Sequence, residues 1–342
     1  MACHIDTGRH DTLPRMEQRV VGHSGLRVSE LGLGTMTWGR DTDALDAADQ
    51  LRDFVDAGGT LVDTAASYGG GDAERVLGSL LDGQVDRAEL VLCTKAGLVR
   101  TRDGARADTS RRSLLDGLDA SLARLGTDHV DLFLVHTPDS STPPAEVADT
   151  LQQVVASGRA RYVGLSNHPA WASSYLAGAL ARTQAPVTAL QLEYSLVQRG
   201  VEHEALPAAR ALGQGVLAWS PLGRGVLTGK YRGAVPSDSR AASPHLGAFV
   251  SQYLDARATG VVEAVATAAA GLGREPLEVA LAWLLARAGV ASAIVGARTP
   301  GQLQASLAAL DLVLPAELYD ALDDVSAPEG GYPERWDGAP PL

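Results

Sequence analysis

The sequence predicts an α/β protein, a closed (β/α)₈ barrel of the TIM type with an N-terminal β-hairpin and a long loop after the seventh strand. Eight short apolar runs that are typical of strands alternate with helical segments along the chain. The connections between them are short, with one exception, and no change of composition marks a linker between domains. Such alternation favours a closed parallel barrel over an open, doubly wound sheet, and these barrels often exceed about 250 residues.

The individual elements follow in order from the amino terminus. Arg19–Gly22 and Leu26–Val28 flank the turn residues His23-Ser24-Gly25 and predict a hairpin. Short apolar runs predict the barrel strands, which are Leu31–Thr35, Leu61–Asp63, Leu90–Lys95, Val130–Val135, Tyr162–Leu165, Thr188–Leu192, Val216–Trp219 and Ala293–Val295. Helical periodicity, with glycines as end signals, predicts the helices Ala44–Ala57, Ala73–Leu81, Arg111–Leu125, Ala145–Ser157, Trp171–Ala181, Glu204–Leu212, Leu254–Leu272, Pro276–Ala288, Gly301–Leu310 and Pro315–Val325.

Three segments stand outside this alternation. Residues 220–253 are rich in Gly, Pro and Ser, and a structureless loop of that length is usually functional or disordered. Residues 1–15 are polar and are predicted to form a flexible extension. We therefore expect a single barrel domain over residues 16–330, followed by a C-terminal tail over residues 331–342.

Composition excludes several functional classes. The net charge of −12 argues against a nucleic-acid partner, because binding to a phosphate backbone needs a basic face. The sequence has no apolar run long enough for a membrane helix and no signal peptide, so we expect a cytoplasmic protein without a membrane partner. The two cysteines, Cys3 and Cys93, do not predict a disulfide, and the histidines show no metal-ligand spacing, so no metal site is predicted.

Polar or aromatic residues follow the ends of six predicted strands. In a parallel barrel these ends meet at one edge, where catalytic groups collect. They are Asp63, Lys95, His136, Asn167, Gln191 and Trp219.

Lys95 is the most informative of these residues, because the chain has only one other lysine, Lys230, and otherwise uses arginine. A compact ammonium beside Tyr68 would stabilise a tyrosinate, and Asp63 would pair with that ammonium. A buried structural ion pair with a tyrosine nearby explains this stretch equally well.

Two glycine-containing stretches do not qualify as phosphate-binding motifs. Residues 32–37 lack the third glycine of the dinucleotide fingerprint. Residues 225–230 are one residue short of a P-loop, and Tyr231 stands where that motif needs Ser or Thr. Neither stretch is expected to bind phosphate in the way of these motifs.

Six motifs together resemble the aldo-keto reductase superfamily, in order and from about Arg19 to Val325. They are Asp63-x4-Tyr68, Thr94-Lys95, Val135-His136, Gly164-x-Ser166-Asn167, Gln191-x-x-Tyr194 and Trp219-Ser220-Pro221-Leu222. The resemblance is nearest to bacterial members close to the potassium-channel β subunits and the sugar ketone reductases. It implies a barrel that binds NADPH in an extended pose without a Rossmann domain. It also implies that Tyr68 is the general acid, that Lys95 lowers the pKa of Tyr68, and that His136 orients the substrate carbonyl.

The same resemblance implies the cofactor and substrate contacts. Trp219 would stack on the nicotinamide, and Arg298 would meet the 2′-phosphate, which the planar fork of arginine suits. The residues expected to bind cofactor are Gly34, Thr35, Met36, Asp63, Ser166, Asn167, Gln191, Trp219, Ser220, Pro221, Leu222, Arg224, Lys230, Gly296, Arg298, Gln302 and Ser306. Trp38, Tyr68 and His136 are expected to contact the substrate. Ala305 and Ser306 stand where many related sequences carry a Glu and an Asn that hold the adenine.

The predicted function is NADPH-dependent reduction of an aldehyde or ketone, a small-molecule carbonyl substrate whose identity the sequence does not select. One alternative is a cofactor-binding redox sensor or auxiliary subunit on the same fold, with slow turnover. A second is a phosphate-binding barrel isomerase or aldolase in which Lys95 forms a Schiff base. No oligomeric state is predicted.

Overall fold

The computed structural model describes residues 16–331 except 82, 103, 238 and 244–246. The expected N-terminal extension over residues 1–15 lies outside the described residues, as does all of the expected C-terminal tail except residue 331.

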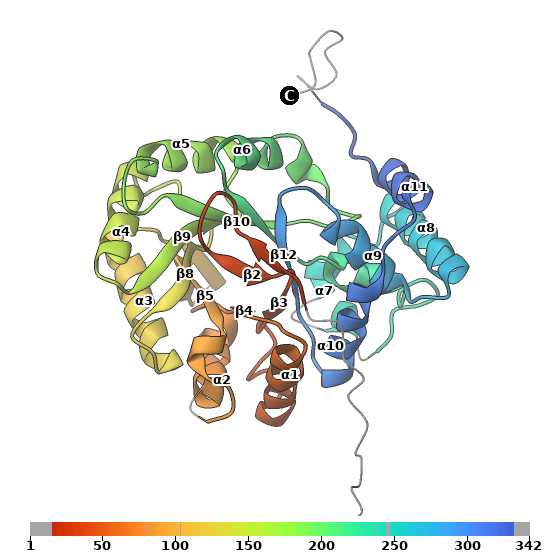
Figure 1. The fold of residues 1–342 in the computed structure, drawn as a ribbon, viewed down its shortest axis with the longest axis horizontal. Helices are drawn as coiled ribbons and strands as arrows, with labels where there is room; N and C mark the ends of the chain where they lie inside the picture. The colour runs from red at the N-terminus through yellow and green to blue at the C-terminus, as the bar shows by residue number, and fades with distance from the viewer. Residues whose placement is uncertain (1–15, 82, 103, 238, 244–246, 332–342) are drawn as a thin grey trace, which may run out of the picture.

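Within the described residues, eight parallel strands close into a barrel, which confirms the predicted fold (Figure 1). The last strand pairs with the first through Ala293 and Leu31, so the sheet has no free edge. In chain order the barrel strands are β3 (Leu31–Gly34), β4 (Leu61–Asp63), β5 (Val91–Ala96), β8 (Val130–Val135), β9 (Ala160–Ser166), β10 (Val187–Glu193), β11 (Gly215–Trp219) and β12 (Val290–Val295).

Helices surround this barrel on the outside (Figure 1). Helix α3 buries an apolar stripe that includes Leu114, Leu118 and Leu122, and it packs against β5. The helix Pro276–Leu285 ends three residues earlier than predicted. The described helices are α1 (Ala44–Asp56), α2 (Asp72–Leu81), α3 (Arg111–Leu125), α4 (Pro144–Ala156), α5 (Ala170–Leu180), α6 (Ala205–Ala211), α7 (Gly247–Ser251), α8 (Ala256–Leu272), α9 (Pro276–Leu285), α10 (Pro300–Leu307) and α11 (Ala316–Ser326).

Two hairpins accompany the barrel. The predicted N-terminal hairpin is present as β1 (Gln18–Val20) and β2 (Arg27–Ser29), and its Val21, Leu26 and Val28 pack against barrel residues such as Leu61 and Leu217. It therefore closes the amino-terminal end of the barrel. A second hairpin, β6 (Leu98–Thr101) with β7 (Gly104–Ala107), was not predicted, because its strands do not alternate apolar and polar residues.

The long segment after β11 is partly helical rather than structureless. Besides α7 it contains 3₁₀ turns at Gly223–Thr228 and Arg240–Ala242. No helix among the described residues is long and apolar enough to cross a membrane.

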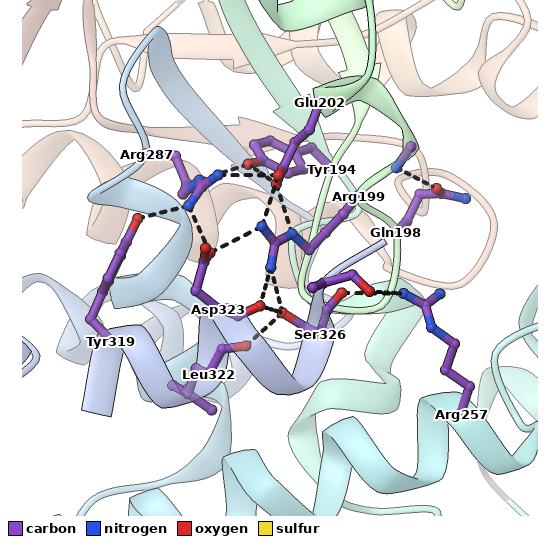
Figure 2. Close-up of polar contacts among 12 residues, drawn as sticks. Tyr194, Gln198, Arg199, Glu202, Arg257, Arg287, Tyr319, Leu322, Asp323 and Ser326 are labelled. Atoms are coloured by element: carbon purple, nitrogen blue, oxygen red, sulfur yellow. Dashed lines mark hydrogen bonds and ion pairs between the residues drawn. The ribbon is translucent and has the colours of Figure 1, made fainter. Parts of the chain in front are cut away.

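A charged network fastens α11 to the barrel (Figure 2). The buried Arg199 side chain donates two hydrogen bonds to the carboxylate of Glu202 and two more to α11, at the Asp323 carbonyl and the Ser326 hydroxyl. Arg287 forms ion pairs with both Glu202 and Asp323. The loop after β10 and the end of α11 are therefore held together.

Candidate active site

The carboxyl ends of β4, β5 and β8 bring the predicted catalytic residues together. Asp63 ends β4, Lys95 lies near the end of β5, and His136 directly follows β8. Tyr68 begins a 3₁₀ turn, Tyr68–Gly70, that follows β4. The strands are neighbours in the barrel, so all four residues share one edge, as the sequence predicted.

Lys95 is fully buried, and its ammonium makes three hydrogen bonds. Lys95 Nζ donates to Asp63 Oδ2 at 2.7 Å, to the Thr64 carbonyl at 2.8 Å and to the Tyr68 hydroxyl oxygen at 3.3 Å. An ammonium has three N–H donors, so this set uses them all. Because Lys95 donates to the Tyr68 oxygen, the hydroxyl hydrogen of Tyr68 is left for another acceptor.

Asp63 is held on both carboxylate oxygens. Its Oδ2 accepts from Lys95, and its Oδ1 accepts from Gln191 Nε2 at 2.7 Å. Burial alone would lower the pKa of Lys95, but Asp63, with smaller contributions from Tyr68 and Cys93, outweighs this effect, and the pKa of Lys95 lies above its ordinary value. The lysine therefore stays charged.

The pKa of Tyr68 is set by opposing effects. Burial raises the pKa of Tyr68, and the charge and hydrogen bond of Lys95 lower it. The effect of burial on the pKa is larger than the effect of Lys95, so the net pKa of Tyr68 lies above the ordinary value of a phenol. Tyr68 is consequently protonated near neutral pH, which is the state that a general acid needs.

His136 lies beside Tyr68 as a neutral imidazole. The two rings meet edge to face at a centroid distance of 6.0 Å, and His136 Nδ1 is 3.4 Å from the Ser67 hydroxyl. Burial, together with the positive charge of Lys95, lowers the pKa of His136 to about 3.

This shift predicts a pH effect on stability. Between about pH 3 and 6.5 the unfolded chain protonates His136 and the folded chain does not, so the contribution of His136 to the free energy of unfolding falls as pH drops through this window. We expect His136→Gln to reduce the loss of stability on acidification from neutral pH. Urea unfolding of both proteins at about pH 7.5 and 4.5 measures this; an equal loss in both would contradict the neutral histidine.

A cavity of about 610 Å³ opens at this edge of the barrel. Most of the predicted site residues line it, namely Gly34, Met36, Asp63, Tyr68, His136, Ser166, Asn167, Gln191, Trp219, Ser220, Pro221, Leu222, Arg224, Lys230, Gly296, Arg298, Gln302 and Ser306. Its volume lies within the range of roughly 300–1,000 Å³ that is typical of cofactor and small-molecule sites.

Two predicted contact residues do not reach this cavity. Trp38, expected to touch the substrate, is completely buried, and its indole N–H donates to Gln50 Oε1 of α1 at 3.1 Å. Thr35, expected to touch the cofactor, is also buried and donates to the Asp63 carbonyl at 3.2 Å. Both side chains lie behind the residues that line the cavity, and their polar groups are hydrogen-bonded in the core.

Asn167 links two other predicted residues. Its amide nitrogen donates to the His136 carbonyl at 3.0 Å, and its amide oxygen accepts from Trp219 Nε1 at 3.0 Å. Asn167 has a positive φ of 58°, as do Ser220 (52°) and Arg224 (59°) on the same cavity wall. Positive φ is strained for residues other than glycine and is concentrated at functional sites.

Arg224 is hydrogen-bonded within the protein. Its guanidinium donates to both carboxylate oxygens of Glu193, at 2.8 and 2.6 Å, and to the Phe249 carbonyl at 2.5 Å. The guanidinium therefore joins the loop after β11 to β10 and α7, at a position that also lines the cavity.

Phe249 was not predicted as a site residue. It lines the cavity and stacks parallel to Trp219, with ring centroids 6.3 Å apart. The chain has only three phenylalanines, and an aromatic residue in a Gly/Pro/Ser-rich segment was the signal that could have identified it.

A buried carboxylate behind the site also escaped prediction. Glu74 accepts from the Thr94 hydroxyl at 2.6 Å and from Arg124 Nε at 2.7 Å. Arg124 lies under the turn that carries Tyr68, since a Cβ at Gly71 would approach its Nε to 2.6 Å. The network ties α2, α3 and β5 to that turn.

The far end of the cavity suits an anionic group. Arg298, Gly301 and Gln302 line it at the N-terminus of α10, where Thr299 is the N-cap. Helix N-termini present N–H groups and a positive dipole. Together with the Trp219 ring, this wall fits a ligand with a flat ring at one end and phosphate at the other.

Comparison with known proteins identifies the family. The model of the aldo/keto reductase family matches residues 30–327. The chain belongs to the aldo/keto reductase family. This membership makes it an oxidoreductase of the carbonyl-reducing class, whose members generally use a nicotinamide dinucleotide.

Several relatives are similar over nearly their whole length. The uncharacterized oxidoreductase YrpG of Bacillus subtilis is 34% identical over 335 residues, which cover 94% of this chain and 99% of YrpG. A probable voltage-gated potassium channel subunit beta of Oryza sativa is 33% identical, covering 94% of this chain and 98% of the relative. L-glyceraldehyde 3-phosphate reductase of Escherichia coli K12 is 33% identical, covering 87% and 88%.

Proposed function

We propose that this aldo/keto reductase reduces an aldehyde or ketone to the alcohol with NADPH, and that Tyr68 is the general acid. One observation carries the proposal: Lys95 donates to the Tyr68 oxygen at 3.3 Å, which leaves the hydroxyl hydrogen for a substrate oxygen. Tyr68 and His136 line the same cavity, so a carbonyl oxygen there has two polar neighbours.

Each catalytic residue then has a defined task. NADPH supplies the hydride when it is bound. Tyr68 gives its proton to the carbonyl oxygen, and the charge of Lys95 stabilises the tyrosinate that remains. Neutral His136 orients the carbonyl, and Asp63 keeps Lys95 charged and in place. General acid assistance of this kind typically contributes about 10²–10⁴-fold.

The Schiff-base alternative is disfavoured by the same contacts. A lysine nucleophile must lose its proton, whereas Lys95 donates three hydrogen bonds and has a raised pKa. Its complete burial also leaves no approach for a substrate carbonyl.

Arg298 is proposed to distinguish NADPH from NADH. A guanidinium binds a phosphate through charge-assisted hydrogen bonds. We expect Arg298→Ala to raise the Kd for NADPH by roughly 10–100-fold, which corresponds to the loss of one or two such bonds, and to change the Kd for NADH little. Fluorescence titration with each nucleotide measures both constants, and equal weakening for the two would contradict the assignment.

The channel-subunit relatives support a second candidate function, a cofactor-binding sensor with slow turnover. The same titration decides between the two when it is followed by assays with aldehydes and ketones, phosphorylated sugars included. Tight NADPH binding with turnover supports the reductase, and tight binding without turnover on any carbonyl supports the sensor. Absence of binding by either nucleotide would overturn both.

Two further predictions accompany this proposal. The catalytic domain is proposed to span residues 16–330, and the protein is proposed to act in the cytoplasm. A truncated protein limited to these residues should keep NADPH binding, and loss of binding would show that the flanking residues contribute.

A further inference from the structure

The outer face of α5 differs from an ordinary solvent-exposed helix. Trp171 and Tyr175 are 70% and 58% exposed and lie one turn apart. No charged residue occurs in Ala170–Leu180. Surface helices usually carry charged residues on the solvent side, so this face is unusually apolar for a surface exposed to water.

A comparison with α1 shows that one exposed apolar side chain does not by itself indicate an interaction surface. Leu45 of α1 is 79% exposed, but it is a single apolar residue on a helix that also carries Asp46, Asp49, Arg52 and Asp53. Isolated exposed apolar side chains are normal, whereas a contiguous apolar patch marks an interaction site. The α5 face, defined here as Trp171, Ser174, Tyr175, Gly178 and Ala179, is contiguous at helical spacing.

The shape of the α5 face is self-complementary. A Cβ at Gly178 would meet nothing within 4 Å, so the surface there is open, while the bulky Trp171 stands two turns away on the same face. If two α5 helices pair antiparallel about a two-fold axis between Ser174 and Tyr175, each Trp171 comes to lie over Gly178 of the other copy. An isologous interface requires this kind of match.

We propose that the α5 face is the contact surface of a two-fold symmetric homodimer. Each chain carries a net charge of −12, so two copies repel over most of their surface and can approach best through an uncharged face. An anionic membrane fits less well, because α5 offers no Lys or Arg to it.

The aromatic side chains supply part of the area that a stable pair needs. An aromatic side chain buries about 150–250 Å² in full, and Trp171 and Tyr175 are 70% and 58% exposed, so the four from two copies supply roughly 400–650 Å². The small residues between them and the flanks of α4 and α6, which pack beside α5, extend this toward the roughly 1,200 Å² at the lower limit of specific interfaces (Figure 1). The α5 face lies on the outside of the barrel, whereas the cavity opens at the strand ends.

Sedimentation velocity and light scattering of the full chain, over a wide range of concentrations, test the proposal. The wild type should reach twice the chain mass of 35.6 kDa. Trp171→Glu and Tyr175→Glu should each weaken dimerisation by roughly 30-fold or more per symmetric contact, as expected for a buried aromatic anchor. Leu45→Glu is the matched control and should remain dimeric, and circular dichroism checks that each variant is folded.

A charge exchange tests the register of the two helices. Trp171→Arg and Gly178→Glu should each weaken the dimer, and the double variant should recover affinity, because each arginine then faces a glutamate of the other copy. A monomeric wild type at all concentrations would overturn the proposal, as would a dimer that Trp171→Glu leaves intact. Binding of a monomeric wild type to phosphatidylcholine vesicles that requires Trp171 would overturn it in favour of a membrane surface.

Discussion

Tyr68→Phe is expected to lower kcat for carbonyl reduction by roughly 10²–10⁴-fold, the range of general acid catalysis, and to leave the Kd for NADPH close to the wild-type value. The substitution removes only the hydroxyl oxygen. The core around it should keep its structure, because Lys95 retains its bonds to Asp63 and the Thr64 carbonyl.

Single-turnover kinetics with saturating NADPH, alongside fluorescence titration, separate the two parts of this prediction. Tyr162→Phe is a suitable control, since Tyr162 is half-buried on β9 and does not line the cavity. Its activity should match that of the wild type. Near-normal turnover by Tyr68→Phe would remove Tyr68 from the role of proton donor.

The sequence predicted the location of the site better than its contacts. Residues that follow successive parallel strands must meet at one edge, so Asp63, Lys95 and His136 could be placed together from their spacing alone. The β-hairpin after β5 escaped prediction because its strands carry no alternating pattern.

Side-chain direction was the part that spacing could not supply. The orientation of Arg224 depends on the carboxylate of Glu193, which comes from another strand. Whether Trp38 faces the cavity depends on Gln50, which α1 places behind it. The net direction of the Tyr68 pKa shift could not be read from the sequence, because the effect of burial that opposes the Lys95 charge depends on the packed structure.

Lys95→Arg is expected to reduce kcat about as severely as Tyr68→Phe. The lysine site is fully buried and places three hydrogen-bond acceptors around one nitrogen. A guanidinium is planar and larger, so it cannot place one N–H on each of these acceptors. The tyrosinate formed during proton transfer would lose its nearest positive charge.

A loss of activity in Lys95→Arg must be distinguished from a loss of stability. Variants that remove the charge at residue 95 make this distinction. Lys95→Met leaves the Asp63 carboxylate buried without its ion pair, which typically costs about 3–5 kcal/mol of unfolding free energy. Combining it with Asp63→Asn removes both charges, so we expect urea unfolding to show that the double variant recovers part of this stability. Turnover should remain lost in the double variant, because no charge is left to stabilise the tyrosinate. Recovery of activity together with stability would mean that Lys95 serves the fold and not the proton transfer.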